Sequence, residues 1–183
     1  MKIIRYFCEA VIIYIFFIIS KFIGLKLSRS VFSVIFKRIG PIIRSNNLVN
    51  KNLSRFSKSI TENEKKEIMS NMWKNYGMTF IEYIFLKKFR DGSKHIKIDG
   101  EIILEKIAKS NKPVIFVSGH FANFELMSME ITKKKIKLAT IYRPLNNFFL
   151  NPLMEYLRKK YICKNQIQKG RLGVKNCINF IKD

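Results

Sequence analysis

A histidine and a glutamate stand close together in the run SGHFANFE, residues 118–125. A carboxylate bonded to one imidazole nitrogen fixes the tautomer of the ring and raises the basicity of the other nitrogen. Such a pair can take the proton from an alcohol as the alcohol attacks a thioester, so no serine or cysteine nucleophile is needed. On one continuous helix this spacing would turn the two side chains about 140° apart. We therefore expect His120 on a turn, which Gly119 permits, and Glu125 on the helix that follows.

The elements around this pair are predicted to alternate between strands and helices. Val114–Val117 is a short β-prone run typical of a buried strand, and a helix is expected from about Asn123 to Thr132. His120 thus follows the carboxyl end of a strand, where α/β folds place their chemistry. A strand at Leu138–Tyr142 and a helix at Pro152–Lys160 come next. This order predicts an α/β fold, an αβα sheet domain with parallel crossovers.

Further elements are expected on either side of these. A short strand at His95–Ile98 and a helix at Glu101–Lys109 precede the buried strand, and His95 is expected at the surface without a partner. Thr61 and Glu64 have the spacing of a capping box at a helix start. Behind them a helical stripe is predicted to face the core, made of Trp73, Tyr76, Phe80 and Ile84. Residues 170–183 read as a loop that enters a helix.

The amino-terminal segment is apolar and lacks a polar face. Tyr6–Ile23 favours a membrane anchor, a transmembrane or deeply embedded helix, over a cleaved signal peptide or a buried core helix. Ser28–Ile43 is predicted to be a basic interfacial helix that ends near Gly40-Pro41. We therefore predict an anchor over residues 1–45 and an acyl-transferring domain over 46–183. By the positive-inside rule, the body is held in the cytoplasm by Lys21, Lys26, Arg29, Lys37, Arg38 and Arg44.

The net charge is extreme: 35 Lys and Arg against 13 Asp and Glu give +22. Such a charge indicates a polyanionic partner, either nucleic acid, an anionic membrane or a phosphorylated substrate. Nucleic acid is disfavoured, because the cations are spread along the chain and no binding module is recognisable. Cys8, Cys163 and Cys177 fit neither a disulfide framework nor a zinc site. No metal or nucleotide motif is present, so no cofactor is expected beyond the acyl donor.

Two motifs carry a specific resemblance. The run VIFVSGHFANFE, followed by IYRPLNN, resembles the lipid A late acyltransferases, the lauroyl/myristoyl acyltransferase family, and the similarity covers nearly the whole chain. The related glycerolipid acyltransferases share a His-x4-Asp/Glu box. Glu125 in place of aspartate, together with the YRP motif, favours the lipid A branch. A lysophosphatidate-type acyltransferase is the nearest enzymatic alternative.

The resemblance implies a role for each site residue. His120 would be the general base and Glu125 the carboxylate that orients it. Arg143 and Arg158 match arginines that the family carries near the active site, where a guanidinium binds a substrate phosphate or an oxyanion. The donor would be an acyl group on acyl carrier protein and the acceptor a hydroxyl on an acyl chain of a lipid A precursor. This is a step of lipopolysaccharide biosynthesis at the cytoplasmic face of the bacterial inner membrane.

One departure from the family pattern concerns the carboxyl end. Family members continue with another strand, an Asp-Gln-Asp type motif and a Phe-rich segment that help to complete the site. None of these follows before Asp183, so we expect the carboxyl-terminal portion to be missing. The alternative to an active enzyme is therefore an inactive, membrane-associated remnant.

Overall fold

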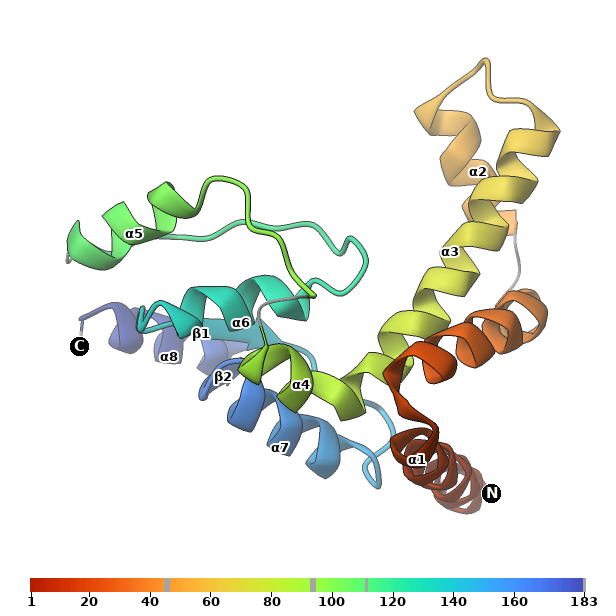
Figure 1. Ribbon diagram of the computed structural model, residues 1–183, viewed down its shortest axis with the longest axis horizontal. Coiled ribbons are helices and arrows are strands. Elements are labelled where there is room, and N and C mark those ends of the chain that lie inside the picture. The colour runs from red at the N-terminus through yellow and green to blue at the C-terminus, as the bar shows by residue number, and fades with distance from the viewer. Residues whose placement is uncertain (45–46, 93–94, 111, 183) are drawn as a thin grey trace. The chain divides into compact units, whose positions relative to one another are not determined.

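The computed structural model describes residues 1–44, 47–92, 95–110 and 112–182. The chain forms two compact units: the sheet unit, Met1–Phe16 with Ile84–Asp183, and the helical unit, Phe17–Tyr83. The described residues are mostly helical and include a small parallel sheet (Figure 1). The predicted division of roles, an anchor over 1–45 and a catalytic domain over 46–183, stays a prediction.

The described residues of the helical unit form three helices. The second part of α1 (Lys2–Ile43) belongs to it, together with α2 (Asn47–Phe56) and α3 (Glu62–Glu82). α1 is kinked at Gly24, whose φ of 80° and ψ of 169° are not helical. The predicted end near Gly40-Pro41 is slightly early, because the Arg44 N–H donates to the Gly40 carbonyl at 3.0 Å and closes one more turn beyond Pro41.

The capping box predicted at the start of α3 is confirmed. The Glu64 N–H donates to the Thr61 hydroxyl at 3.3 Å, and the Thr61 N–H donates to the Glu64 carboxylate at 2.7 Å. These two bonds satisfy backbone donors that the helix itself leaves open.

The predicted core stripe of α3 is confirmed in part. Trp73 is buried, and the Phe80 ring packs on Phe17, Phe32 and Phe36 with centroids 5.3, 5.9 and 5.5 Å apart. Tyr76 is 55% exposed, so its assignment to the core was wrong. The helices approach closely at a glycine instead, since a Cβ on Gly77 would stand 2.2 Å from the Phe32 carbonyl oxygen.

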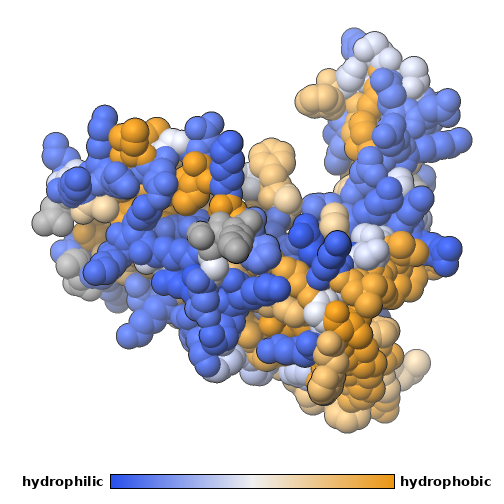
Figure 2. Space-filling model, viewed as in Figure 1, coloured by the Kyte–Doolittle hydropathy of each residue, from blue (hydrophilic) through white to orange (hydrophobic). Residues whose placement is uncertain are grey.

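α1 is long and apolar enough to cross a membrane. Its most apolar 18-residue stretch has a mean hydropathy of 2.2, and 22% of that stretch is buried inside the protein. Figure 2 shows hydrophobic residues gathered over this helix. Core helices of soluble proteins reach the same length and composition, but they are mostly buried.

The sheet unit is built around a parallel pair of strands. β1 (Ala139–Tyr142) and β2 (Asn165–Gln168) are joined by α7 (Asn151–Tyr161), with Ala139 opposite Asn165 and Tyr142 opposite Gln168. This is a parallel β-α-β crossover of the general kind expected for an alternating pattern. β2 was not among the predicted strands, however, and neither predicted neighbour of β1, His95–Ile98 or Val114–Val117, forms a strand. The other described elements of the unit are α4 (Leu86–Asp91), α5 (Glu101–Ser110), α6 (Glu125–Lys133) and α8 (Arg171–Lys182), together with the last two residues of the 3-10 turn η1 (Tyr83–Phe85).

Two predicted strands are absent from the described residues. Neither His95–Ile98 nor Val114–Val117 forms a strand, so the predicted αβα sheet is reduced to one strand pair in a mostly helical protein. The second run is also not buried, since Ile115 is 83% and Val117 90% exposed. A β-prone run becomes a strand only when a neighbour pairs with it, and local pattern does not supply that partner. His95 is exposed as expected, and its ring meets Phe89 edge-on at 5.5 Å.

The close approach at Gly77 leads to a test of the helical unit. Gly to Ala inside an exposed helix normally stabilises it by about 1 kcal/mol. We expect Gly77→Ala to lower the thermal unfolding midpoint instead, because its methyl group would collide with the Phe32 backbone. Asn71→Ala, at an exposed position of the same helix, is the control and should raise the midpoint slightly. A Gly77→Ala protein as stable as the control would contradict this packing.

Candidate active site

All four residues predicted for the site line one cavity of the sheet unit. His120, Glu125, Arg143 and Arg158 stand around a space of about 1040 Å³. This is about the upper end of the volumes found for small-molecule sites, roughly 300–1,000 Å³. Most of the remaining wall is apolar and includes Ile115, Phe116, Met127, Ile131, Ile141, Ile167 and Phe180. The cavity therefore combines a polar cluster with walls suited to a hydrocarbon chain.

His120 lies on the turn before α6, as predicted. It is exposed, and its ring lies 4.3 Å from that of Phe124, centroid to centroid. Ala122, two residues after His120, has a positive φ of 47°. Gly119 matters for space, because a Cβ there would lie 2.4 Å from the Phe121 ring. This turn directs the chain into α6 and brings Glu125 to the first helical position.

Glu125 is buried and paired with Arg158. Two guanidinium nitrogens of Arg158, Nε and Nη2, each donate to Glu125 Oε1 at 2.7 Å. The side chains are only 10% and 13% exposed, so little water reaches the pair. The amino end of α6 adds a favourable field, since the helix dipole is positive there. The ion pair thus joins the start of α6 to α7. The catalytic and substrate-binding roles of these residues remain predictions.

Tyr142 and Glu155 extend this cluster, and sequence reasoning did not single them out. The Tyr142 hydroxyl donates to Glu155 Oε1 at 2.7 Å, and the Asn151 amide donates to the same oxygen at 2.9 Å. The Arg158 guanidinium lies 6.0 Å from the centre of the Tyr142 ring. The signal was present in the sequence, because Tyr142 begins the YRP motif and Glu155 stands three positions before Arg158.

The surroundings alter the acidity of this second pair. Burial, then the hydrogen bond to Glu155, raises the pKa of Tyr142 to about 12. The same hydrogen bond is the main reason that the pKa of Glu155 is lowered. The phenol therefore stays protonated and continues to donate to the carboxylate. Arg143, the next residue of the motif, is exposed at the cavity.

The far end of α6 is held by a second set of polar bonds. Arg90 donates to the Thr132 hydroxyl at 2.6 Å and to the Met129 carbonyl at 3.1 Å. The Thr132 hydroxyl in turn donates to the Ile162 carbonyl at 2.7 Å, just after α7. Beside it, burial raises the pKa of the Cys163 thiol, which donates to the Leu138 carbonyl. α6 is thus tied at both ends to its neighbours, and the turn with His120 starts from a fixed helix.

Comparison with known proteins identifies one family. Residues 1–170 match the family described as bacterial lipid A biosynthesis acyltransferase. The match includes every residue of the polar cluster and the whole of α1. No match was found among curated proteins or among solved structures.

Because the ion pair between Glu125 and Arg158 is buried, replacing only one of the two residues should strongly lower the stability of the protein. Arg158→Met should lower the free energy of unfolding by about 3–5 kcal/mol, because Glu125 would be left buried without its guanidinium. The double variant Glu125→Leu/Arg158→Met should recover much of this loss. Lys159→Met, at the exposed neighbouring position, is the control and should change little. Denaturant unfolding in detergent measures these variants and the single variant Glu125→Leu. A loss in the double variant equal to the sum of the two single losses would contradict the coupling.

The raised pKa of Tyr142 predicts alkaline sensitivity. An unfolded tyrosine has a pKa of 10.0 and folded Tyr142 one of about 12. Its contribution to stability is therefore complete below pH 10, falls as the unfolded phenol ionises, and is lost as pH rises through about 12. Tyr142→Phe lacks this component. The stability difference between parent and variant should shrink across that interval, and a constant difference would contradict the assignment.

Proposed function

Because the chain belongs to the bacterial lipid A biosynthesis acyltransferase family, we propose that it transfers an acyl chain from acyl carrier protein to a hydroxyl on an acyl chain of a lipid A precursor. Membership of this family makes the chain an acyltransferase of lipid A biosynthesis. The observation that carries the finer proposal is the cavity, where His120 and the Glu125–Arg158 pair share one space with apolar walls.

The reaction needs one group that moves a proton. His120 takes the proton from the acceptor hydroxyl as its oxygen attacks the thioester carbonyl, and a tetrahedral oxyanion forms. Collapse of this intermediate breaks the C–S bond and leaves a new ester. The imidazolium then returns the proton to the departing thiolate of acyl carrier protein. An exposed histidine at the cavity can reach both partners, and general-base catalysis of this kind contributes about 10²–10⁴-fold to the rate.

The charged neighbours have complementary roles in this proposal. Glu125 is proposed to orient the imidazole and to stabilise its charged form. Arg158, whose guanidinium is bonded to Glu125, fixes the position of that carboxylate. Arg143 is exposed at the same cavity, so its guanidinium can bind a phosphate of the acceptor or the oxyanion. Tyr142 and Glu155 support the cluster from β1 and α7.

The acyl chain would lie against the apolar walls. These walls are formed by side chains of α6, β1, β2 and α8, and by the exposed run that precedes His120. Burying a methylene group is worth about 0.8 kcal/mol, so such a surface binds a long chain without any specific polar contact. No metal or nucleotide takes part in the proposed reaction, and acyl carrier protein is the co-substrate.

We also propose a location at the cytoplasmic face of the bacterial inner membrane. The supporting features are the apolar helix α1 and the cations on either side of its most apolar part, among them Lys2, Arg5 and Lys21, because the anionic cytoplasmic leaflet attracts such charges. Lipid A precursors are amphipathic, so an enzyme held at this surface meets its acceptor by diffusion within the membrane.

The chemistry is tested by comparing the two histidines of the chain. Membranes that contain the chain are given acyl carrier protein with a labelled acyl group and a tetra-acylated lipid A precursor. His120→Ala should lower acyl transfer by about 10²-fold or more. His95→Ala is the matched control, because His95 is exposed and does not line the cavity. It should keep the parent activity. Transfer that survives in His120→Ala would exclude the general-base role.

The acceptor separates the proposal from its nearest enzymatic rival. Lysophosphatidate is offered in place of the lipid A precursor, with the same donor. Transfer to the precursor alone supports the lipid A assignment. Transfer to lysophosphatidate alone would show a glycerolipid acyltransferase. An absence of transfer to either would favour the inactive remnant.

A further inference from the structure

The loop that follows the YRP motif is bound to the first part of α1. This loop, residues 144–150, is called the Phe148 loop below. The Asn147 amide donates to the Tyr6 carbonyl at 2.9 Å and to the Glu9 carboxylate at 3.3 Å. The Tyr14 hydroxyl donates to the Phe149 carbonyl at 2.9 Å. All these groups belong to the sheet unit, so the first turns of α1 and this loop form one surface.

The closest contacts with the loop follow one stripe of α1. Tyr6, Ala10 and Tyr14 recur at four-residue steps on the side facing the loop, and Ala10 is only 2% exposed. Around this stripe the apolar side chains remain open, with Ile3 64% and Phe7 53% exposed. Phe7 also meets the Phe149 ring of the loop edge-on at 5.5 Å. Much of the apolar surface around these contacts nevertheless stays exposed to solvent.

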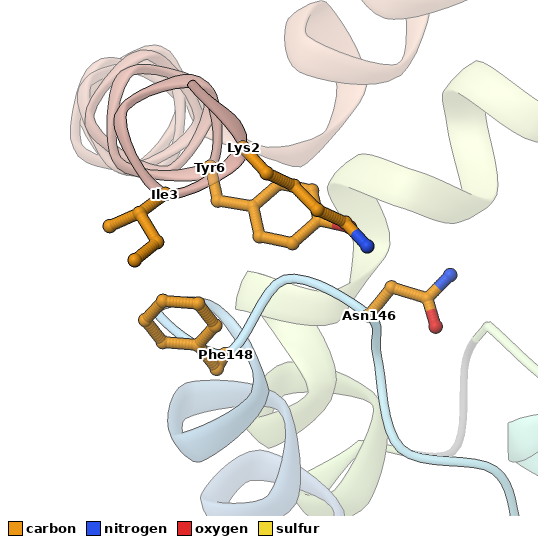
Figure 3. Close-up of a pocket in the computed structure, with 5 residues that line it drawn as sticks. All are labelled: Lys2, Ile3, Tyr6, Asn146 and Phe148. Carbon is orange, nitrogen blue, oxygen red and sulfur yellow. The ribbon is translucent and has the colours of Figure 1, made fainter.

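The Phe148 loop continues this apolar face. Phe148 is 51% and Leu145 39% exposed, although both are large and apolar. Phe148 meets the Tyr6 ring edge-on at 6.1 Å, and a cavity of about 400 Å³ separates the two segments. Figure 3 shows Ile3 and Phe148 gathered at one side of this cavity, and the polar ends of Lys2 and Asn146 at the other.

Cations and an aromatic ring border the apolar face. The Lys2 ammonium lies 5.9 Å and the Arg5 guanidinium 5.3 Å from the centre of the Tyr6 ring. Tyrosine, lysine and arginine with apolar stems are the residues that concentrate where hydrocarbon meets headgroups. Arg5 also pairs with the Glu9 carboxylate at 3.3 Å, so cations, a carboxylate, an aromatic ring and exposed apolar side chains stand together on these turns, as is typical of a membrane interface.

We propose that the Phe148 loop and the first turns of α1 together form a membrane-docking surface, with Phe148 and Leu145 inserted at the level of the upper acyl chains. The occupant is an anionic bilayer, because the surface is continuous with the apolar helix α1 and is bordered by Lys2 and Arg5. The loop can tolerate this environment because the buried side chain of Asn147 satisfies a backbone group of the loop. Its amide oxygen accepts a hydrogen bond from the Phe149 N–H at 3.1 Å.

This docking has a consequence for the site. Arg143 immediately precedes the Phe148 loop and lines the large cavity. A loop held at the interface places this guanidinium at headgroup level, where the phosphates of a membrane-embedded acceptor lie. The docking surface itself does not rest on the proposed chemistry, and the two are tested by different readouts.

The depth of the loop is measured by tryptophan quenching. The full chain is reconstituted in vesicles of phosphatidylglycerol and phosphatidylcholine, with bromine either near the headgroup end or near the methyl end of the phosphatidylcholine chains. The parent, with Trp73 as its single tryptophan, provides the baseline. Phe148→Trp adds a probe to the loop and Leu145→Trp a second one. Leu172→Trp is the matched control, because Leu172 is 78% exposed and lies on α8, away from the loop (Figure 1).

The proposal requires a specific pattern. The additional tryptophan fluorescence of Phe148→Trp and of Leu145→Trp should be quenched more strongly by bromine near the headgroup end than by bromine near the methyl end. The additional fluorescence of Leu172→Trp should not be quenched by either brominated lipid. An unquenched probe in the loop, with far-ultraviolet circular dichroism like the parent, would overturn the proposal. Equal quenching at 148 and 172 would overturn it too, because contact with lipid would then not be particular to this surface.

Discussion

The buried ion pair between Glu125 and Arg158 is the constraint on which the site depends. It joins the first turn of α6 to α7, and both side chains are nearly inaccessible to water. A carboxylate in such a place is tolerable only with its guanidinium present, so the two helices keep their relative position. Since Thr132 binds the carbonyl that follows α7, both ends of α6 are held to the same neighbour. The turn that carries His120 is therefore connected to a helix, α6, whose position is fixed at both ends.

A second feature of the structure is the amount of apolar surface that remains exposed. A soluble enzyme buries most of its large apolar stretches, whereas α1 keeps most of its apolar side chains outside. The walls of the large cavity are apolar as well. Both features suit a protein whose substrate is a lipid and whose surroundings are a membrane. The charge of +22 is consistent with the same setting, because phosphorylated lipids and anionic headgroups attract it.

The polar cluster shows how sequence and structure divide the information on the site. The His120–Glu125 spacing and the YRP motif were sufficient to select four residues, and all four line one cavity. The spacing did not reveal that Glu125 is bonded to Arg158, because the two are far apart in the chain and meet only after α6 and α7 pack. Tyr142 and Glu155 were missed for the same reason. Their hydrogen bond links a strand to a helix, and no local pattern encodes it.

Local interactions were read correctly from the sequence. The capping box at Thr61, the helices of the carboxyl half and the strand at 139–142 all follow from side-chain preferences within a few residues. Tertiary structure alone decided strand pairing and burial. Val114–Val117 has the composition of a buried strand and is neither buried nor paired, because a strand needs hydrogen-bonding partners from distant segments. Likewise, only packing decided that Tyr76 faces solvent, that Gly77 meets the backbone of α1, and that Arg158 binds a carboxylate.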